Sequence, residues 1–117
     1  MEKFYDLLQK IKETPGLYLG EASIVLLEAF IVGYSFCEHN NNITVKDDWF
    51  AGFNEYIAKK YKINTTHNWA RIIRFHSGSD SEAFYEFYKE FYEYLKKYPT
   101  QNDRINFMNK EIEKRCS

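Results

Sequence analysis

The segment from residue 83 to 94 constrains the fold most, because it places seven aromatic side chains within twelve residues at helical spacing. An ordinary amphipathic helix presents an apolar face of roughly 100°. The surplus of rings therefore predicts either a central helix packed on two sides or a surface kept for a partner. At 100° per residue, the centre of the apolar arc is formed by Phe84, Phe87, Phe91, Tyr94 and Leu95, with Tyr88 at its edge.

Helical spacing continues along most of the chain and predicts an all-α fold. Apolar residues recur at i, i+3, i+4 and i+7 from Phe4, and the pattern stops at Pro15. Ser79 and Glu82 have the spacing of a capping box and predict the start of the aromatic helix. We expect one domain over residues 1–117, a single compact bundle of five or six helices. The expected helices cover residues 4–13, 22–37, 48–61, 69–76, 80–98 and 100–112, with a turn at 15–20.

The run from Ala22 to Cys37 is almost continuously apolar. Its β-branched residues also permit strands, but its length and the lack of an internal turn favour a helix at the centre of the bundle. Glu28 interrupts the run, which is also shorter than the roughly 20 residues of a membrane span, so we expect no membrane insertion. Cys37 is expected to be a small core residue.

Charge and cysteine usage narrow the class of protein. Sixteen basic and seventeen acidic residues give a net charge of −1, which removes the broad positive field of a general phosphate binder. Nucleic acid is therefore not the expected partner. The two cysteines have no disulfide or metal spacing, and the N-terminus does not resemble a signal peptide, so we expect a cytoplasmic protein.

No residue pattern indicates catalysis. His39, His67 and His76 have no second ligand at i+3 or i+4, and Cys37 has no neighbouring base. The glycines form no phosphate-binding loop, and the carboxylate pairs lie where helix starts and exposed faces attract acids. The sequence predicts a protein that is not an enzyme and has no metal or cofactor.

Acidic residues are concentrated in two segments. Residues 79–93 hold five acids against Lys89 alone, and residues 21–38 hold three acids and no base. If the segments share a face, they present a negative field beside aromatic rings, which suits a basic protein surface; the alternative is an ordinary solvated helix face. The candidate partner contacts are Asp80, Glu82, Tyr85, Glu86, Glu90 and Tyr92, with Asp47, Asp48 and Trp49 as a second patch.

A wider pattern resembles the small bacterial immunity proteins encoded beside contact-dependent or other polymorphic toxins. The resemblance covers about Glu13 to Tyr94 and begins at the turn Pro15–Gly20, where the family often has Met in place of Leu17. It continues through Leu27, Phe30, Gly33, Tyr34, Phe53–Ile57, Tyr61, Trp69, Ile72, Ile73, Glu82, Phe84 and Phe87. It implies a cytoplasmic protein that binds and blocks one cognate toxin domain, often a nuclease, and it implies no catalytic residues.

Two other functions stay open. A nucleic-acid-binding regulator would use the basic residues Lys59, Lys60, Lys62, Lys96 and Lys97, although cations are favoured at helix C-termini in any case. A helical adaptor or self-associating subunit would bury the aromatic surplus against a second copy. We expect a monomer or weak dimer.

Overall fold

The computed structural model describes residues 3–40, 48–64 and 68–116, and every regular element in these ranges is a helix. The all-α prediction is confirmed. These ranges contain seven helices rather than five or six, because the expected turn after Thr14 closes into a short helix with Pro15 in its first turn. The helices are α1 (Lys3–Glu13), α2 (Pro15–Leu19), α3 (Ile24–Asn40), α4 (Phe53–Lys60), α5 (Trp69–Phe75), α6 (Asp80–Lys97) and α7 (Gln101–Cys116).

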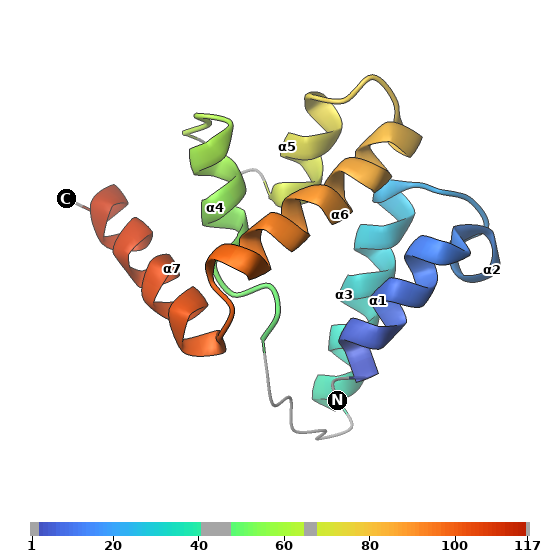
Figure 1. Cartoon of the computed structure of the whole chain (residues 1–117), viewed down its shortest axis with the longest axis horizontal. Coiled ribbons are helices and arrows are strands. Elements are labelled where there is room, and N and C mark those ends of the chain that lie inside the picture. Colours follow the sequence, from blue (N-terminus) through green and yellow to red (C-terminus); the bar gives the residue numbers. More distant parts are fainter. Residues whose placement is uncertain (1–2, 41–47, 65–67, 117) are drawn as a thin grey trace.

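Helix α6 runs through the middle of the molecule, with α4 and α5 on one side and α1 and α3 on the other (Figure 1). Phe84, Phe87 and Phe91 are completely buried on it. Tyr88, expected at the edge, is also completely buried, and its hydroxyl donates to the Leu8 carbonyl of α1 at 2.7 Å. Of the two alternatives for the aromatic surplus, the structure therefore shows a central helix packed on two sides, and the second side accounts for much of the surplus.

The core between α4, α5 and α6 is largely aromatic. The Phe50 ring stacks on Phe91, with centroids 4.9 Å apart, and on Trp69 at 5.7 Å. Phe50 lies in a turn before α4, which begins at Phe53 rather than near residue 48. Gly52 makes this turn, because its φ of +78° lies in the left-handed region that side chains disfavour.

Helix α3 is not at the centre of the bundle, so that expectation is wrong. Its buried residues, Ile24, Leu27 and Ile31, lie on one side, whereas Val32 on the other side is 61% exposed. Cys37 is exposed and is not a core residue. Because α6 fills the middle, α3 is covered on one side only.

Helix α7 lies at the outer edge, as its thin apolar stripe indicates, and packs against α4 (Figure 1). Its inner side carries Phe107 and the completely buried Arg104, whose guanidinium donates to the carbonyls of Tyr98 and Pro99 at 3.0 and 3.2 Å. These bonds tie α7 to the end of α6. None of the described helices combines the length and hydropathy that a bilayer span requires.

Candidate functional site

The acids at the start of α6 act as helix caps. Asp80 Oδ1 accepts from the backbone N–H groups of Ile24 and Val25 at 3.0 and 3.3 Å, so Asp80 caps the N-terminus of α3. Glu82 donates its N–H to Ser79 Oγ at 3.1 Å, and its carboxylate accepts from the Gly78 N–H at 3.0 Å. The predicted cap at Ser79 is confirmed, with Gly78 as the reciprocal donor.

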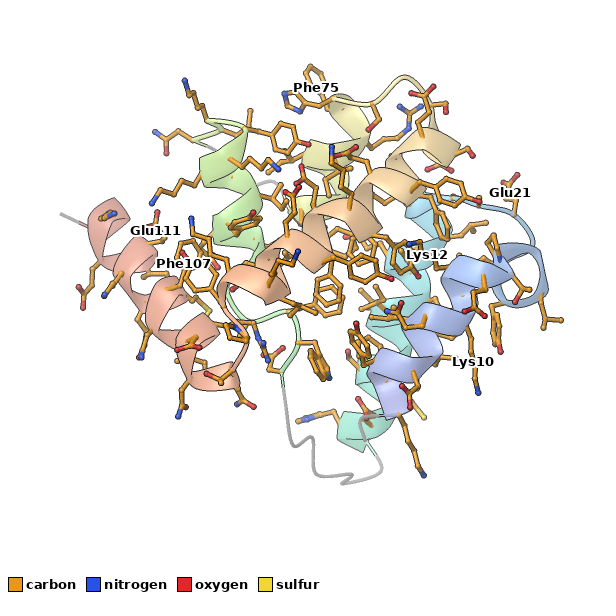
Figure 2. The ribbon with its side chains drawn as sticks, in the orientation of Figure 1. Lys10, Lys12, Glu21, Phe75, Phe107 and Glu111 are labelled. Atoms are coloured by element: carbon orange, nitrogen blue, oxygen red, sulfur yellow. The ribbon has the colours of Figure 1, made fainter. Side chains whose placement is uncertain are left out.

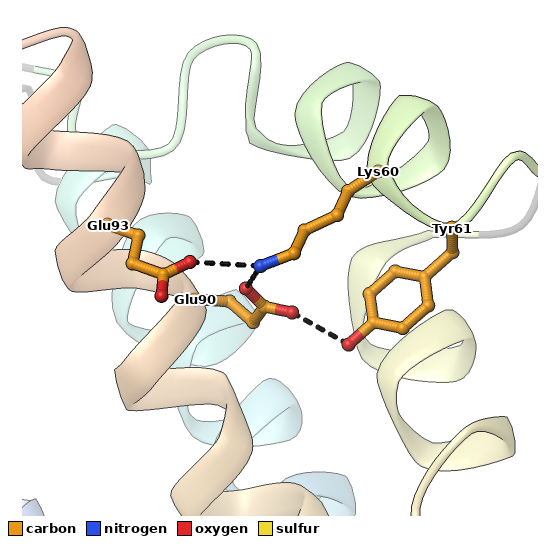
Figure 3. Close-up of polar contacts among 4 residues, drawn as sticks. All are labelled: Lys60, Tyr61, Glu90 and Glu93. Atoms are coloured by element: carbon orange, nitrogen blue, oxygen red, sulfur yellow. Dashed lines mark hydrogen bonds and ion pairs between the residues drawn. The ribbon is translucent and has the colours of Figure 1, made fainter.

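Glu90 is 0% exposed, so it does not lie on an accessible face with the other candidate contacts. It lies between α4 and α6, where it forms an ion pair with Lys60 and accepts from the Tyr61 hydroxyl at 2.7 Å (Figure 3). Glu93 also contacts Lys60, at 2.9 Å. A buried carboxylate needs such partners, and Glu90 therefore joins two helices and is closed to a partner protein.

This cluster changes the protonation of its neighbours. Partial burial lowers the pKa of Lys60, but hydrogen bonds to Glu90 and Glu93 outweigh it, and the net shift is upward. Desolvation and the hydrogen bond to Glu90 raise the pKa of Tyr61. Desolvation and the charge of Glu90 raise the pKa of Glu86, which is half-buried. The cluster thus keeps Lys60 charged and Tyr61 neutral, the states that hold Glu90 in place.

The remaining residues of the aromatic helix differ in exposure. Tyr85 is 49% exposed, as expected of a contact residue. Tyr92 is half-buried; its hydroxyl hydrogen-bonds to Gln9, and Lys12 Nζ lies 4.8 Å from its ring centroid. Of the six contacts predicted on this helix, Tyr85 therefore remains the most accessible side chain without an internal hydrogen bond.

The second predicted patch lies in the turn before α4, and Asp47 falls outside the described residues. Asp48 is exposed, and its carboxylate accepts from the Phe50 N–H at 3.1 Å. Trp49 is half-buried between Tyr5, with ring centroids 5.0 Å apart, and Arg104 at 5.2 Å. These contacts organise the turn and leave little ring surface for a partner.

An uncovered apolar surface runs along α3. Its members, which we call the α3 stripe, are Val25, Ala29, Val32, Gly33 and Phe36, and all five are exposed. Val25 and Phe36 are 59% and 65% exposed. Spacings of four, three and four residues place Val25, Ala29, Val32 and Phe36 along one line of the helix. Continuous apolar surface of this kind is typical of an interaction site.

A groove between α3 and α5 continues this surface. It has a volume of about 590 Å³ and is lined by Ile24, Val25, Glu28, Ala70, Arg71, Arg74 and Phe75. Phe75 is 83% exposed and projects from the end of α5 (Figure 2). Arg71 and Arg74 are exposed and pair with no acid among the described residues. Exposed aromatic and arginine side chains beside an apolar groove have the composition of a binding hot spot.

Gly33 adds a second observation on the same helix. A Cβ built on it meets no atom within 4 Å, so packing inside this chain does not require glycine there. Glycine within a helix is less favourable than alanine by roughly 0.5–1 kcal/mol. A small residue at this place leaves room for another backbone to approach the α3 stripe.

The sequence did not single out this surface. An apolar run with residues on all sides predicts a buried helix, and the pattern does not reveal which side stays uncovered. The exposure of Arg71, Arg74 and Phe75 depends on how α5 docks. The available signal was Gly33, a residue unfavourable in a helix interior, in the middle of α3.

Comparisons with known proteins add no assignment. No family model, curated protein sequence or solved structure matches this chain. Within residues 3–40, 48–64 and 68–116, no group of three His, Cys, Asp or Glu side chains is placed to hold a metal ion. The surface formed by the α3 stripe and the α3–α5 groove is therefore the candidate site on the grounds of its own geometry.

Proposed function

We propose that this protein is a protein-binding inhibitor, an immunity protein that neutralises a cognate toxin domain by covering its active site. The observation that carries the proposal is the uncovered α3 stripe beside the groove that contains Phe75. The resemblance to immunity proteins supplies the kind of partner and the cytoplasmic location. A nuclease is the toxin activity that this resemblance favours.

The binding energy in this proposal comes from burying the exposed apolar side chains. Burial of a fully exposed Val or Phe side chain contributes about 1.5–3 kcal/mol. Val25, Val32, Phe36 and Phe75 are each more than half exposed, so together they are enough for a hot spot at the centre of an interface. The acids of α6 take a smaller part than the sequence predicted, because Asp80, Glu82 and Glu90 form internal bonds.

The test is protection of cells against the polypeptide domain encoded by the neighbouring gene. We expect that domain to stop growth when expressed alone and to be neutralised by the wild-type protein. The double variant Val32→Asp/Phe36→Asp should lose protection, because it places charges in the buried interface. The control is Ile112→Asp, which adds a charge at an exposed apolar residue of α7, away from the stripe.

Circular dichroism should show that all variants keep their helices. A neighbouring domain that is not toxic, or whose toxicity persists beside the wild-type protein, contradicts the proposed function. Equal protection by the stripe variant and the control contradicts the choice of surface.

The basic residues give less support to a nucleic-acid-binding function. Lys60 pairs with the buried Glu90, and Lys59 contacts Glu111 at 3.4 Å. Self-association has a more specific basis, because the α3 stripe is a surface that a second copy could cover. Sedimentation at increasing protein concentration distinguishes that case from inhibition.

A further inference from the structure

We infer that the partner presents an amphipathic helix whose apolar side chains pack on the α3 stripe and whose carboxylates pair with Arg71 and Arg74. This inference rests on the proposed function, since it describes the segment of the partner that this protein binds.

The shape of the surface favours a helix. Val25 and Phe36 are eleven residues apart, which at 1.5 Å per residue corresponds to about 16 Å, or three helical turns. Helices pack closely when small residues let their backbones approach. Ala29 and Gly33 lie in the middle of the stripe, and a Cβ built on Gly33 would meet no atom of the described residues within 4 Å apart from its own helix backbone. A helix lying along α3 would fill this space.

The charges around the groove favour an acidic helix. Glu28, the carboxylate that lines the groove, accepts from the Asn68 side chain, and Asp80 caps α3. Arg71 and Arg74 pair with no described acid. The groove therefore carries two guanidinium groups against the single carboxylate of Glu28, and a carboxylate of the partner can bind each guanidinium in a bidentate manner. The positive charge of these arginines is opposite to that of the acidic surface that the sequence predicted.

The same charges argue against a second copy as the occupant. A copy that placed its groove against this one would bring its own Arg71 and Arg74, and the one carboxylate of that lining, Glu28, already accepts from Asn68. Like charges near an interface oppose association. A different protein, with acids flanking an apolar helical face, complements both the shape and the charge.

The experiment uses two synthetic helical peptides as probes. Each has 18 residues with leucine on one face, and the flanking positions are glutamate in the acidic probe and lysine in the basic probe. Fluorescence anisotropy measures their binding to the full-length protein. We expect the acidic probe to bind at least tenfold more tightly than the basic one, and to weaken as salt rises. We expect Arg71→Glu/Arg74→Glu to reverse the preference and Val32→Asp/Phe36→Asp to abolish binding of both probes.

Three results with the probes would overturn the inference: no binding of either probe, equal binding of the two, or a preference that Arg71→Glu/Arg74→Glu leaves unchanged. A dimer in sedimentation that Val32→Asp dissolves would also overturn it, because a second copy would then cover the stripe. The growth assay separates this inference from the proposed function. Protection that depends on Val32 and Phe36 but survives charge reversal at Arg71 and Arg74 supports the inhibitor and overturns the acidic helix.

Discussion

Gly33 gives the sharpest test of whether the α3 stripe is uncovered in solution. The residue lies in the interior of α3, and a Cβ placed on it meets no atom within 4 Å. Gly33→Ala therefore adds a methyl group without a clash. The substitution removes the extra backbone freedom of glycine in the unfolded chain and restores favourable helix propensity.

The expected stabilisation is about 0.5–1 kcal/mol, the difference between glycine and alanine in a helix interior. For a chain of this size it corresponds to a rise in the melting temperature of roughly 2–6 °C. Urea unfolding followed by circular dichroism measures the free energy, and the slope against denaturant should not change.

The matched control is Gly52→Ala, which should have the opposite sign. Gly52 has a φ of +78°, and a Cβ there would lie 2.5 Å from the Tyr94 hydroxyl and 3.0 Å from the Arg104 carbonyl oxygen. Strain at the backbone and overpacking together predict that the free energy of unfolding falls by at least about 2 kcal/mol. If Gly33→Ala were neutral or destabilising, the space beside Gly33 would be occupied in solution, and the argument for an open stripe would fail.

Substitutions at three residues test the internal roles of the α6 acids. Glu90→Ala should destabilise the fold by about 2–4 kcal/mol in urea unfolding, because Lys60 and Tyr61 lose a buried partner. A loss of stability below about 0.5 kcal/mol, the size of an ordinary surface effect, would contradict this role. Glu86→Gln should stabilise the protein at pH 7 but not below about pH 4. The raised pKa of Glu86 means that the native state binds more protons than the unfolded state, so the stability of the wild type falls as pH rises through the folded pKa. Matching pH profiles of stability for the wild type and the variant would refute this. Asp80→Ala should lower stability by about 1 kcal/mol and speed amide exchange at the start of α3, whereas Asp80→Asn should retain most of the cap. Equal amide exchange in the two variants would argue against a capping role for Asp80.

Local chemistry made part of the fold predictable. The hydroxyl of Ser79 and the following acid identify the start of α6, and Pro15 identifies the end of α1, because each acts on backbone groups only a few residues away. The aromatic surplus of α6 also indicated a central place for this helix, with a partner surface as the alternative. These features depend on spacing within one helix, which the sequence contains.

Contacts between helices were not predictable in the same way. The helical wheel places Glu90 with the solvent-facing acids, and its burial results from Lys60 and Tyr61 of the α4 region, thirty residues earlier. Similarly, Asp80 caps a helix that begins 56 residues before it. For α3, the residue pattern is apolar on every side, so only the packing of its neighbours decides that Val32 and Phe36 remain exposed.

The cap at the start of α3 also has an entropic consequence for recognition. Ser23 Oγ accepts from the Leu26 N–H at 3.1 Å, and Asp80 accepts from the N–H groups of Ile24 and Val25. The end of α3 beside the groove is therefore fixed before a partner binds. Farther along the helix, Phe36 has no such restraint and keeps most of its surface in water. Preorganised groups lose little conformational freedom on binding. The groove end would therefore set which partner fits, while the Phe36 end adapts to it.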